Sequence, residues 1–347
     1  MSLSKIRRNE LTKRILIEIS QASFETKKIH AIAKEFDVSV QSVYNLVNKL
    51  CEESVVKKTR QGKTLSLSLV PVVNTFSYNI STSNEDIAFS DVKDLVKFLP
   101  ENAFKIYEYV FSEMFNNAVE HSEGSKIVVC LHTTSVDVTT FILDNGIGIF
   151  EKIKEKFHLE DRSQSVFELM KGKVTTDPNN HSGEGIFFSS KCSNLFFIVA
   201  NGLTFVTTNM EIPEDEKAQI ESYKQTQGTA IVFNISIANK FNLVDIFNQY
   251  ADPDKGFYKT MVSVQHLEYN ETNPNCISRS QARRLMAGME KFEEVTLDFG
   301  NIPEIGQAFA DEVFRVWQNK NPAIKLNVLN ANKSVSNMIK RIENNKI

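Results

Sequence analysis

The sequence predicts a protein of the α/β class with more than one domain, and three observations support this prediction. The chain of 347 residues is long enough for two or three domains of ordinary size, each with its own core. Apolar residues recur at helical spacing near the N-terminus, whereas strand and helix signals alternate irregularly from 91 to about 240. The pattern of strand and helix signals changes again after Asp252-Pro253, so we expect a smaller domain at 255–347.

Composition excludes several classes of protein. With 41% hydrophobic and 24% charged residues, the chain is typical of a globular protein in water. It has no run of about 20 apolar residues, so we expect no membrane span, and its basic N-terminus lacks the apolar core of a secretory signal. The scattered cysteines favour reduced thiols in the cytoplasm over disulfides or a zinc site: Cys51, Cys130, Cys192 and Cys276.

The first region, 1–70, is predicted to form three helices and a hairpin. Apolar residues recur at helical spacing from 6 to 19 and from 29 to 36, and Ser39 is suited to cap the third helix. That helix turns Val43, Leu46, Val47 and Leu50 inward. A basic stretch from 55 to 64 then leads into an alternating strand at 65–70, which completes a basic hairpin.

This arrangement resembles the winged helix regulators, and the resemblance implies binding of duplex DNA through the third helix and the hairpin. Residues 1–70 hold 13 Lys and Arg against 7 Asp and Glu, a net charge of +6, so the remainder carries −9 of the total −3. A basic head on an acidic body indicates that the head alone meets a polyanion. Winged helices also dock proteins, and that alternative stays open. The expected DNA-binding residues are Gln41, Ser42, Tyr44, Asn45, Lys49, Arg60 and Lys63.

A linker is expected at 71–90, which begins with Pro71 and is rich in Asn, Ser and Thr. A helix follows in which Glu113 and Asn117 lie one turn apart on one face. At that spacing the amide oxygen can take a place on Mg²⁺, while the carboxylate polarises a water or hydroxyl aimed at a γ-phosphate. The Glu-x-x-x-Asn pattern carries no weight alone, because any solvated helix can contain it.

A second motif closes a hairpin whose strands are expected at 126–132 and 136–143. It reads Asp144-Asn-Gly-Ile-Gly148, and its glycines, Gly146 and Gly148, let the backbone pass close to a flat ring. The carboxylate of Asp144 can accept a hydrogen bond from the exocyclic amine of adenine. The alternative is an ordinary turn with an exposed aspartate.

A third motif opens a helix with Gly183 and Gly185. Free N–H groups at a helix N-terminus, together with the helix dipole, form an anion site suited to phosphates. The long stretch between Gly148 and Gly183, with Thr175 to Asn180 near its end, suggests a mobile lid.

In this order, and with Gly228-Thr229 leading into a later strand, the motifs resemble those of the GHKL ATPases over 91–240. The resemblance implies an α/β sandwich with a mixed sheet covered by helices on one face, and a site for ATP and Mg²⁺. Glu113 would be the general base and Asn117 the Mg²⁺ ligand. The remaining ATP-binding residues would be Asp144, Gly146, Gly148, Gly183, Gly185 and Thr229.

The region 255–347 resembles STAS-like α/β domains related to anti-sigma-factor antagonists, through a strand at 295–299 and a helix from about 306 to 318. Those antagonists carry a phosphorylatable serine between the strand and the helix, whereas this chain has Gly306-Gln307-Ala308 without a hydroxyl. Three arginines in this region could bind phosphate or form a solvated helix face: Arg279, Arg283 and Arg284.

These patterns predict an ATP-responsive, DNA-binding regulator with a weak ATPase activity and a STAS-like tail that binds a protein partner. Two alternatives stay open: a serine/threonine kinase of the anti-sigma-factor type acting on a separate partner, and a non-catalytic ATP-sensing adaptor. The sequence leaves the oligomeric state open, a homodimer included.

Overall fold

The computed structural model describes residues 5–21, 26–61, 64–173, 183–208, 227–252, 254, 256–267, 276 and 278–344. The protein is mixed α/β and divides into two compact units. The first unit comprises Met1–Ile149 and Ser189–Leu243, and the second comprises Phe150–Phe188 and Val244–Ile347. None of the helices in the described ranges has the length and apolarity needed to cross a membrane.

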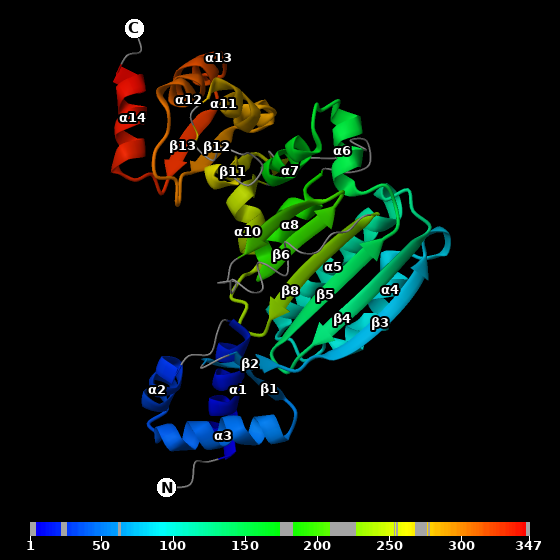
Figure 1. Ribbon diagram of the computed structural model, residues 1–347. Helices are drawn as coiled ribbons and strands as arrows, with labels where there is room; N and C mark the ends of the chain where they lie inside the picture. Colours follow the sequence, from blue (N-terminus) through cyan, green and yellow to red (C-terminus); the bar gives the residue numbers. More distant parts are fainter. Residues whose placement is uncertain are drawn as a thin grey trace. The chain divides into compact units, whose positions relative to one another are not determined.

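The first unit begins with three helices and a hairpin (Figure 1), as the sequence predicts. Ser39 caps the third helix, because its side-chain oxygen accepts a hydrogen bond from the Ser42 N–H at 3.1 Å. The buried core of these elements also includes Val136 from the turn before Asp137, with Ile237 packed against the same core. The elements are α1 (Lys5–Gln21), α2 (Thr26–Glu35), α3 (Val40–Glu52) and the antiparallel pair β1 (Val56–Gln61) and β2 (Thr64–Leu69).

The large sheet of the first unit has six strands among the described residues, in the order β3-β4-β5-β8-β6-β7. Every neighbouring pair is antiparallel, so the expected mixed sheet is wrong. The reason is that β8 lies between β5 and β6 and opposes both, which separates two strands that run in the same direction. The strands are β3 (Val72–Asn79), β4 (Lys126–Thr133), β5 (Asp137–Asp144), β6 (Leu195–Ala200), β7 (Leu203–Thr208) and β8 (Thr229–Ser236).

The stretch expected to be a linker, 71–90, contains β3 and most of the next elements, η1 (Ile80–Thr82) and α4 (Glu85–Val92). Its polar composition reflects an edge strand, in which Phe76 and Tyr78 alternate with exposed Thr75 and Ser77. The Tyr78 ring meets the Phe115 ring edge-on with the centroids 5.2 Å apart, so β3 is held to the core by its inward face.

Helix α5 (Glu101–His121) packs on one face of the sheet against β5 and β8 (Figure 1). Aromatic side chains form its inner stripe, and the Tyr107 and Phe111 rings stack with their centroids 6.0 Å apart. The hydroxyl groups of Tyr107 and Thr140 are hydrogen-bonded at 3.0 Å, which ties the helix to β5. The 3₁₀ helix η2 (Lys93–Leu95) precedes α5.

The second unit contains a parallel sheet with the order β11-β12-β13 in the described residues. Parallel neighbours require crossover connections. Here α11 (Arg279–Met286) links β11 to β12, and a continuous helical stretch from Gln307 to Lys320, with a π-helical middle, links β12 to β13. The elements are α10 (Leu243–Tyr250), β9 (Ala251–Asp252), β10 (Gly256–Phe257), β11 (Lys259–Ser263), η3 (Val264–Leu267), η4 (Met289–Lys291), β12 (Glu294–Asp298), α12 (Gln307–Asp311), η5 (Glu312–Trp317), α13 (Gln318–Lys320), β13 (Lys325–Leu329) and α14 (Lys333–Asn344).

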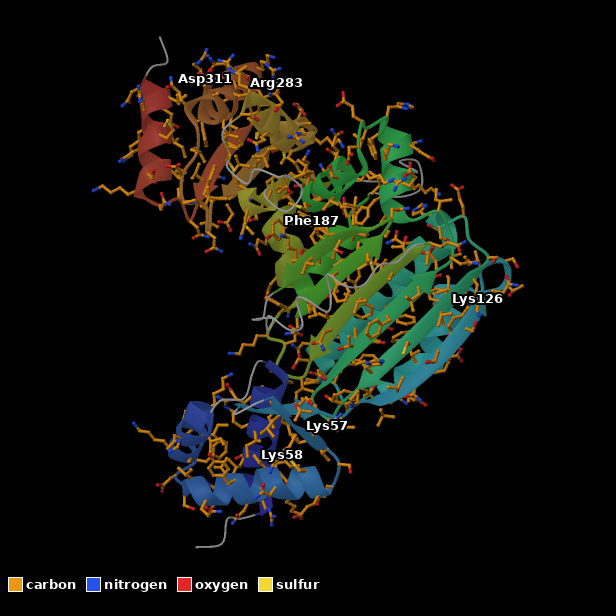
Figure 2. The ribbon with its side chains drawn as sticks, in the orientation of Figure 1. Lys57, Lys58, Lys126, Phe187, Arg283 and Asp311 are labelled. Carbon is orange, nitrogen blue, oxygen red and sulfur yellow. The ribbon has the colours of Figure 1, made fainter. Side chains whose placement is uncertain are left out.

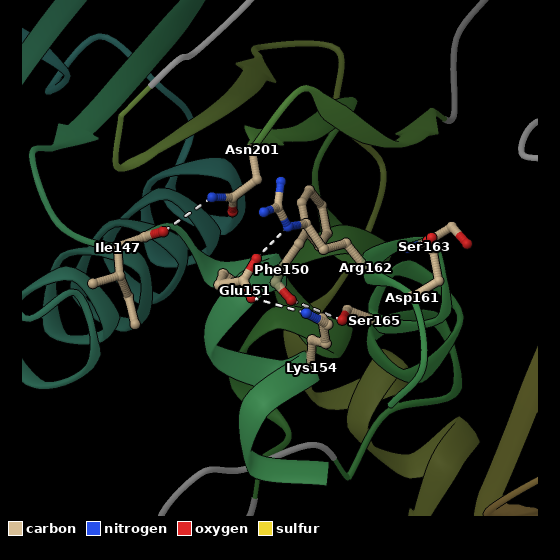
Figure 3. Close-up of polar contacts among 9 residues, drawn as sticks. All are labelled: Ile147, Phe150, Glu151, Lys154, Asp161, Arg162, Ser163, Ser165 and Asn201. Atoms are coloured by element: carbon tan, nitrogen blue, oxygen red, sulfur yellow. Dashed lines mark hydrogen bonds and ion pairs between the residues drawn. The ribbon is translucent and has the colours of Figure 1, made fainter. Parts of the chain in front are cut away.

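Residues 150–188, expected within the central domain 91–240, belong to the second unit. Aromatic contacts explain this assignment: the Phe187 ring lies 4.7 Å from that of Phe257 and 5.0 Å from that of Tyr250, centroid to centroid. Phe187 is labelled in Figure 2. Within the same segment, the Ser165 hydroxyl donates to the Phe150 carbonyl at 2.8 Å, a bond that Figure 3 marks with a dashed line. The segment contains α7 (Arg162–Lys171), nearly all of α6 (Ile149–Phe157) and the first half of α8 (Gly185–Cys192), whose residues from Ser189 belong to the first unit.

Candidate functional site

The candidate site in the first unit is built around Asp144, the last residue of β5. Its side chain is buried at 7% exposure, and its Oδ1 accepts hydrogen bonds from Gly146 N at 2.8 Å and from Thr229 N at 3.2 Å. These donors come from the turn after β5 and from the first residue of its neighbour β8. The Asp144 carboxylate therefore lies where β5 ends and β8 begins, and main-chain N–H groups hold it there.

Burial raises the pKa of the Asp144 carboxyl above its ordinary value, and the hydrogen bonds from Gly146 and from the backbone and side chain of Thr229 oppose part of that rise. A carboxylate has about four lone-pair sites. Among the residues that the structure describes, main-chain and hydroxyl donors from Gly146 and Thr229 leave accepting capacity for a further N–H or O–H group. Because the Asp144 carboxylate is buried, it is suited to accept a hydrogen bond from one N–H or O–H group of a ligand.

Two glycines allow the chain to approach this carboxylate closely. A Cβ on Gly146 would lie 1.9 Å from the Ser122 carbonyl oxygen, and a Cβ on Gly228 would lie 2.0 Å from the Asp144 carbonyl oxygen. Both neighbours are backbone atoms, which cannot move aside. Gly228 also has a φ of +75°, which side chains rarely adopt. Glycine is therefore required on both sides of Asp144.

The loop from Asp144 to Ile149 is fixed by three further contacts. Ile147 N donates to the Ser122 carbonyl at 3.0 Å, and Ile149 N donates to Thr229 Oγ1 at 3.0 Å. Asn201 Nδ2 donates to the Ile147 carbonyl at 3.0 Å (Figure 3). The structure thus brings together four predicted residues of the first unit: Asp144, Gly146, Gly148 and Thr229.

Asn201 was not among the residues predicted for the site. The signal for it was present, because Asn201-Gly202 separates two apolar strands, and Asn-Gly is typical of a two-residue hairpin turn. The Asn-Gly pair predicts the turn. It does not predict the contact of Asn201 with Ile147, because the two residues are far apart in the chain.

Glu113 and Asn117 are half-buried on α5, one turn apart, as the sequence predicts. The helix ends at His121, and the carbonyl of the next residue, Ser122, accepts from the Ile147 N–H, so the C-terminal end of α5 borders the Asp144 loop. Asn117 precedes Ser122 by about 7.5 Å along the helix axis. Among the described residues, no cluster of three or more His, Cys, Asp or Glu side chains is suited to hold a metal ion.

Gly183 and Gly185 belong to the second unit, and Gly185 is the first residue of α8. The Glu184 carbonyl accepts from Phe188 N at 3.0 Å, which forms the first helical turn. Thr175 to Asn180, the expected lid residues, lie outside the described residues.

The predicted DNA-binding residues of α3 mostly face solvent. Gln41, Ser42, Asn45 and Lys49 are exposed, whereas Tyr44 packs partly against the core of the three helices. Gln41 Nε2 donates to Asn45 Oδ1 at 2.9 Å, and Lys49 is paired with Glu53 at 3.4 Å.

On the hairpin, Lys57 and Lys58 of β1 are exposed (Figure 2), and the Lys58 ammonium donates to the Asn48 side chain of α3. The backbone of Arg60 pairs with Leu65 in the β1–β2 ladder, while Lys63 lies outside the described residues. Exposed basic groups therefore continue from α3 onto β1.

Arg279 and Arg283 of α11 form ion pairs and stay largely exposed. Arg279 Nη2 lies 3.3 Å from Asp311 Oδ2, and Arg283 Nε lies 2.8 Å from Glu312 Oε1, while the side chains of Arg279 and Arg283 are 58% and 68% exposed. Figure 2 labels Arg283 and Asp311. The pairing and exposure of Arg279 and Arg283 favour a solvated helix face over a phosphate site.

Comparison with known proteins assigns one part of the chain. No curated protein matches it. Residues 281–336 match the family model of the STAS-like domain of unknown function (DUF4325). The match covers most of α11, then β12, the helical stretch Gln307 to Lys320, β13 and the start of α14. The protein therefore carries a STAS-like domain at residues 281–336.

Proposed function

We propose that the protein is an ATP-responsive DNA-binding regulator whose first unit contains a GHKL-type site for ATP and Mg²⁺. The observation that carries this proposal is the buried carboxylate of Asp144, which main-chain N–H groups hold at the end of β5 with accepting capacity to spare. Such a group is costly to bury unless its hydrogen-bonding capacity is used.

The residues around Asp144 fit an adenine ring. The carboxylate accepts a hydrogen bond from the exocyclic amine, which places a charged acceptor against a neutral donor. On the side where a Cβ would stand, Gly146 meets Ser122 and Gly148 meets Asn201. The adenine ring would therefore lie against the opposite side of this backbone. Thr229 fixes the far side of the loop through the Ile149 N–H.

Asn117 and Glu113 supply the residues for metal and chemistry in this proposal. Mg²⁺ keeps several waters and takes few protein ligands in nucleotide sites, which agrees with a single amide oxygen from Asn117. The bound ATP·Mg²⁺ supplies an activated γ-phosphoryl group. Glu113, one helical turn away, would accept a proton from the attacking water. Gly183 and Gly185 belong to the second unit and are left out of this proposal.

The head formed by α1 to β2 would bind duplex DNA as a winged helix, with Gln41, Ser42 and Asn45 toward base edges. The exposed residues Lys57 and Lys58, with Lys49, would meet phosphates. The STAS-like domain would bind a protein partner, and ATP would alter the relation of head and tail.

The test of the nucleotide proposal combines calorimetric titration of ATP·Mg²⁺ with incubation of the full chain in γ-labelled ATP. We expect Glu113→Ala to bind ATP with the parent affinity and to lose about 10²–10⁴ in the rate of phosphate release. Glu108→Ala on the same helix is the control, because Glu108 is exposed and outside the motif.

Three outcomes would change the proposal. Absence of ATP binding would remove the nucleotide site. Equal turnover in Glu113→Ala and the parent would remove Glu113 as the base. Label that stays on a protein would favour the kinase alternative.

DNA binding is tested with the full chain, because Val136 of the β4–β5 turn contributes to the core of the head. Each phosphate contact contributes a log–log salt slope of about −0.9, so Lys57→Ala combined with Lys58→Ala is expected to flatten the slope by about two units. Gln41→Ala is expected to alter sequence preference instead. A parent chain without salt-dependent duplex binding would favour the adaptor alternative.

A further inference from the structure

The β6–β7 turn lies beside the Asp144 loop although it is distant in the sequence. Its two residues, Asn201 and Gly202, have φ angles of +52° and +78°. This is the backbone of a two-residue hairpin turn, which accepts Asn, Asp or Gly at its first position. The turn itself therefore needs a residue that tolerates positive φ, and it does not need an amide side chain.

The amide of Asn201 makes a contact that the turn does not require. Its Nδ2 donates to the Ile147 carbonyl at 3.0 Å, which fixes the orientation of the peptide before Gly148 (Figure 3). A Cβ on Gly148 would lie 2.2 Å from Asn201 Oδ1 and 2.7 Å from Nδ2. The Asn201 side chain thus occupies the space beside Gly148, and Gly148 has a φ of +86°.

We propose that Asn201 is a positioning residue that sets the adenine specificity of the nucleotide site. This inference rests on the proposed function of the Asp144 loop. Asp144 is held at one end of the loop by Gly146 N and Thr229 N, and Asn201 holds the Ile147–Gly148 peptide at the other end. With both ends fixed, the distance between the carboxylate and the backbone that lines the ring is set before the ligand binds, which lowers the cost of binding.

Two substitutions separate this role from that of the turn. Asn201→Gly keeps the positive φ and removes the donor, whereas Asn201→Asp keeps the φ preference and the size but places an acceptor against the Ile147 carbonyl. Asn301→Gly is the matched control, because Asn301 has a φ of +63° and lies in the second unit.

The experiment measures the affinity of the full chain for ATP and for GTP by calorimetry, and the melting temperature of each variant. We expect both Asn201 variants to melt near the parent temperature and to bind ATP about 3- to 10-fold more weakly. GTP affinity should change less, so the ratio of ATP to GTP affinity falls. Asn301→Gly should change neither affinity.

The outcomes distinguish the inference from the function on which it rests. A parent chain that does not bind ATP overturns the proposed function and the inference together. ATP binding by the parent with an unchanged affinity ratio in both Asn201 variants overturns the inference alone. Equal losses for ATP and GTP that follow a lower melting temperature also overturn it, because they indicate a structural role.

Discussion

The two units of the chain each contain a buried charged side chain held by the main chain, and the two sites differ in how fully that charge is satisfied. In the first unit, Gly146 N and Thr229 N both reach a single oxygen of Asp144. In the second unit, Lys171 is 2% exposed, and its ammonium donates to Glu168 Oε1 at 2.7 Å and to two carbonyls, those of Arg284 at 3.2 Å and Ala287 at 2.5 Å. An ammonium has three donors, so three acceptors use them all.

Burial acts on both groups in the same direction, toward the neutral form. It raises the pKa of Asp144 and lowers the pKa of Lys171, although the charge and hydrogen bond of Glu168 oppose the latter shift. A shifted pKa therefore does not distinguish the two sites. The two sites differ in their remaining hydrogen-bonding capacity. Asp144 can still accept a hydrogen bond from a ligand, whereas all three donors of the Lys171 ammonium have acceptors within the second unit.

The surroundings of Lys171 agree with a structural role. The Thr260 hydroxyl donates to the Lys171 carbonyl at 2.6 Å, and a Cβ on Gly172 would lie 2.7 Å from the Phe257 ring. The ammonium of Lys173 lies 5.0 Å from the centre of the Phe292 ring. Helix α7 is thereby fastened to the strands and helices of the second unit.

The largest expected effect is that of Lys171→Met on stability. The substitution leaves the carbonyls of Arg284 and Ala287 and the Glu168 carboxylate without their donor, and breaking a buried pair in this way costs about 3–5 kcal/mol. We expect the second unit to unfold at lower urea concentration while ATP affinity per folded molecule stays unchanged. Unchanged unfolding would show that the buried ammonium does not hold α7.

The next effect is that of Asp144→Asn on nucleotide binding. The amide still accepts from Gly146 N and Thr229 N through its oxygen, and the buried charge is removed, so the melting temperature is not expected to fall. ATP affinity is expected to fall roughly 5- to 150-fold, the value of one hydrogen bond to a charged group of about 1–3 kcal/mol. Calorimetry that finds the parent affinity in this variant would exclude Asp144 as the adenine acceptor.

The raised pKa of Asp144 predicts a pH dependence with opposite signs for binding and for stability. Because the folded state binds this proton more tightly than the unfolded state, the contribution of Asp144 to stability is greatest below the ordinary carboxyl pKa of 3.8 and is lost as pH rises through the folded value. ATP affinity is expected to fall as pH drops through that same folded value. Asp144→Asn, titrated in parallel, should lack both dependences; if it retains them, another group is responsible.

The smallest effect is expected at an exposed ion pair of the second unit. Arg279 is 58% exposed beside Asp311, and Arg315 also contacts Asp311, with its Nε 2.5 Å from Oδ1. Arg279→Ala is expected to change the free energy of unfolding by about 0.2–1 kcal/mol, since Asp311 keeps Arg315 as a partner. A loss as large as that of Lys171→Met would mean that satisfied buried donors and exposed pairs stabilise this unit equally.

Much of the local structure could be predicted from the sequence. The cap at Ser39, the hairpin that ends at Asp144 and the strand near Val295 follow from side-chain periodicity and turn residues, which act between near neighbours. The edge strand β3 was not predicted, because a strand with one exposed face has the polar composition of a linker.

The sequence also indicated a turn with a carboxylate and glycines after β5, although an ordinary turn has the same pattern. The donors that hold Asp144 and the contact of Asn201 with Ile147 could not be predicted, because they join segments far apart in the chain. The same holds for Lys171, whose sequence position gives no sign that two carbonyls from α11 and the turn after it bury it.

The sequence by itself determined the helices and hairpin of the head, the positions of β4 and β5 to within one residue, and the order of the motifs along the chain. Only the tertiary structure decided that β8 separates β5 from β6 and that residues 150–188 pack with the second unit. The physical reason is the range of the interactions. Periodicity and capping depend on residues a few positions apart, whereas strand order and domain membership depend on which apolar faces meet after the chain has folded.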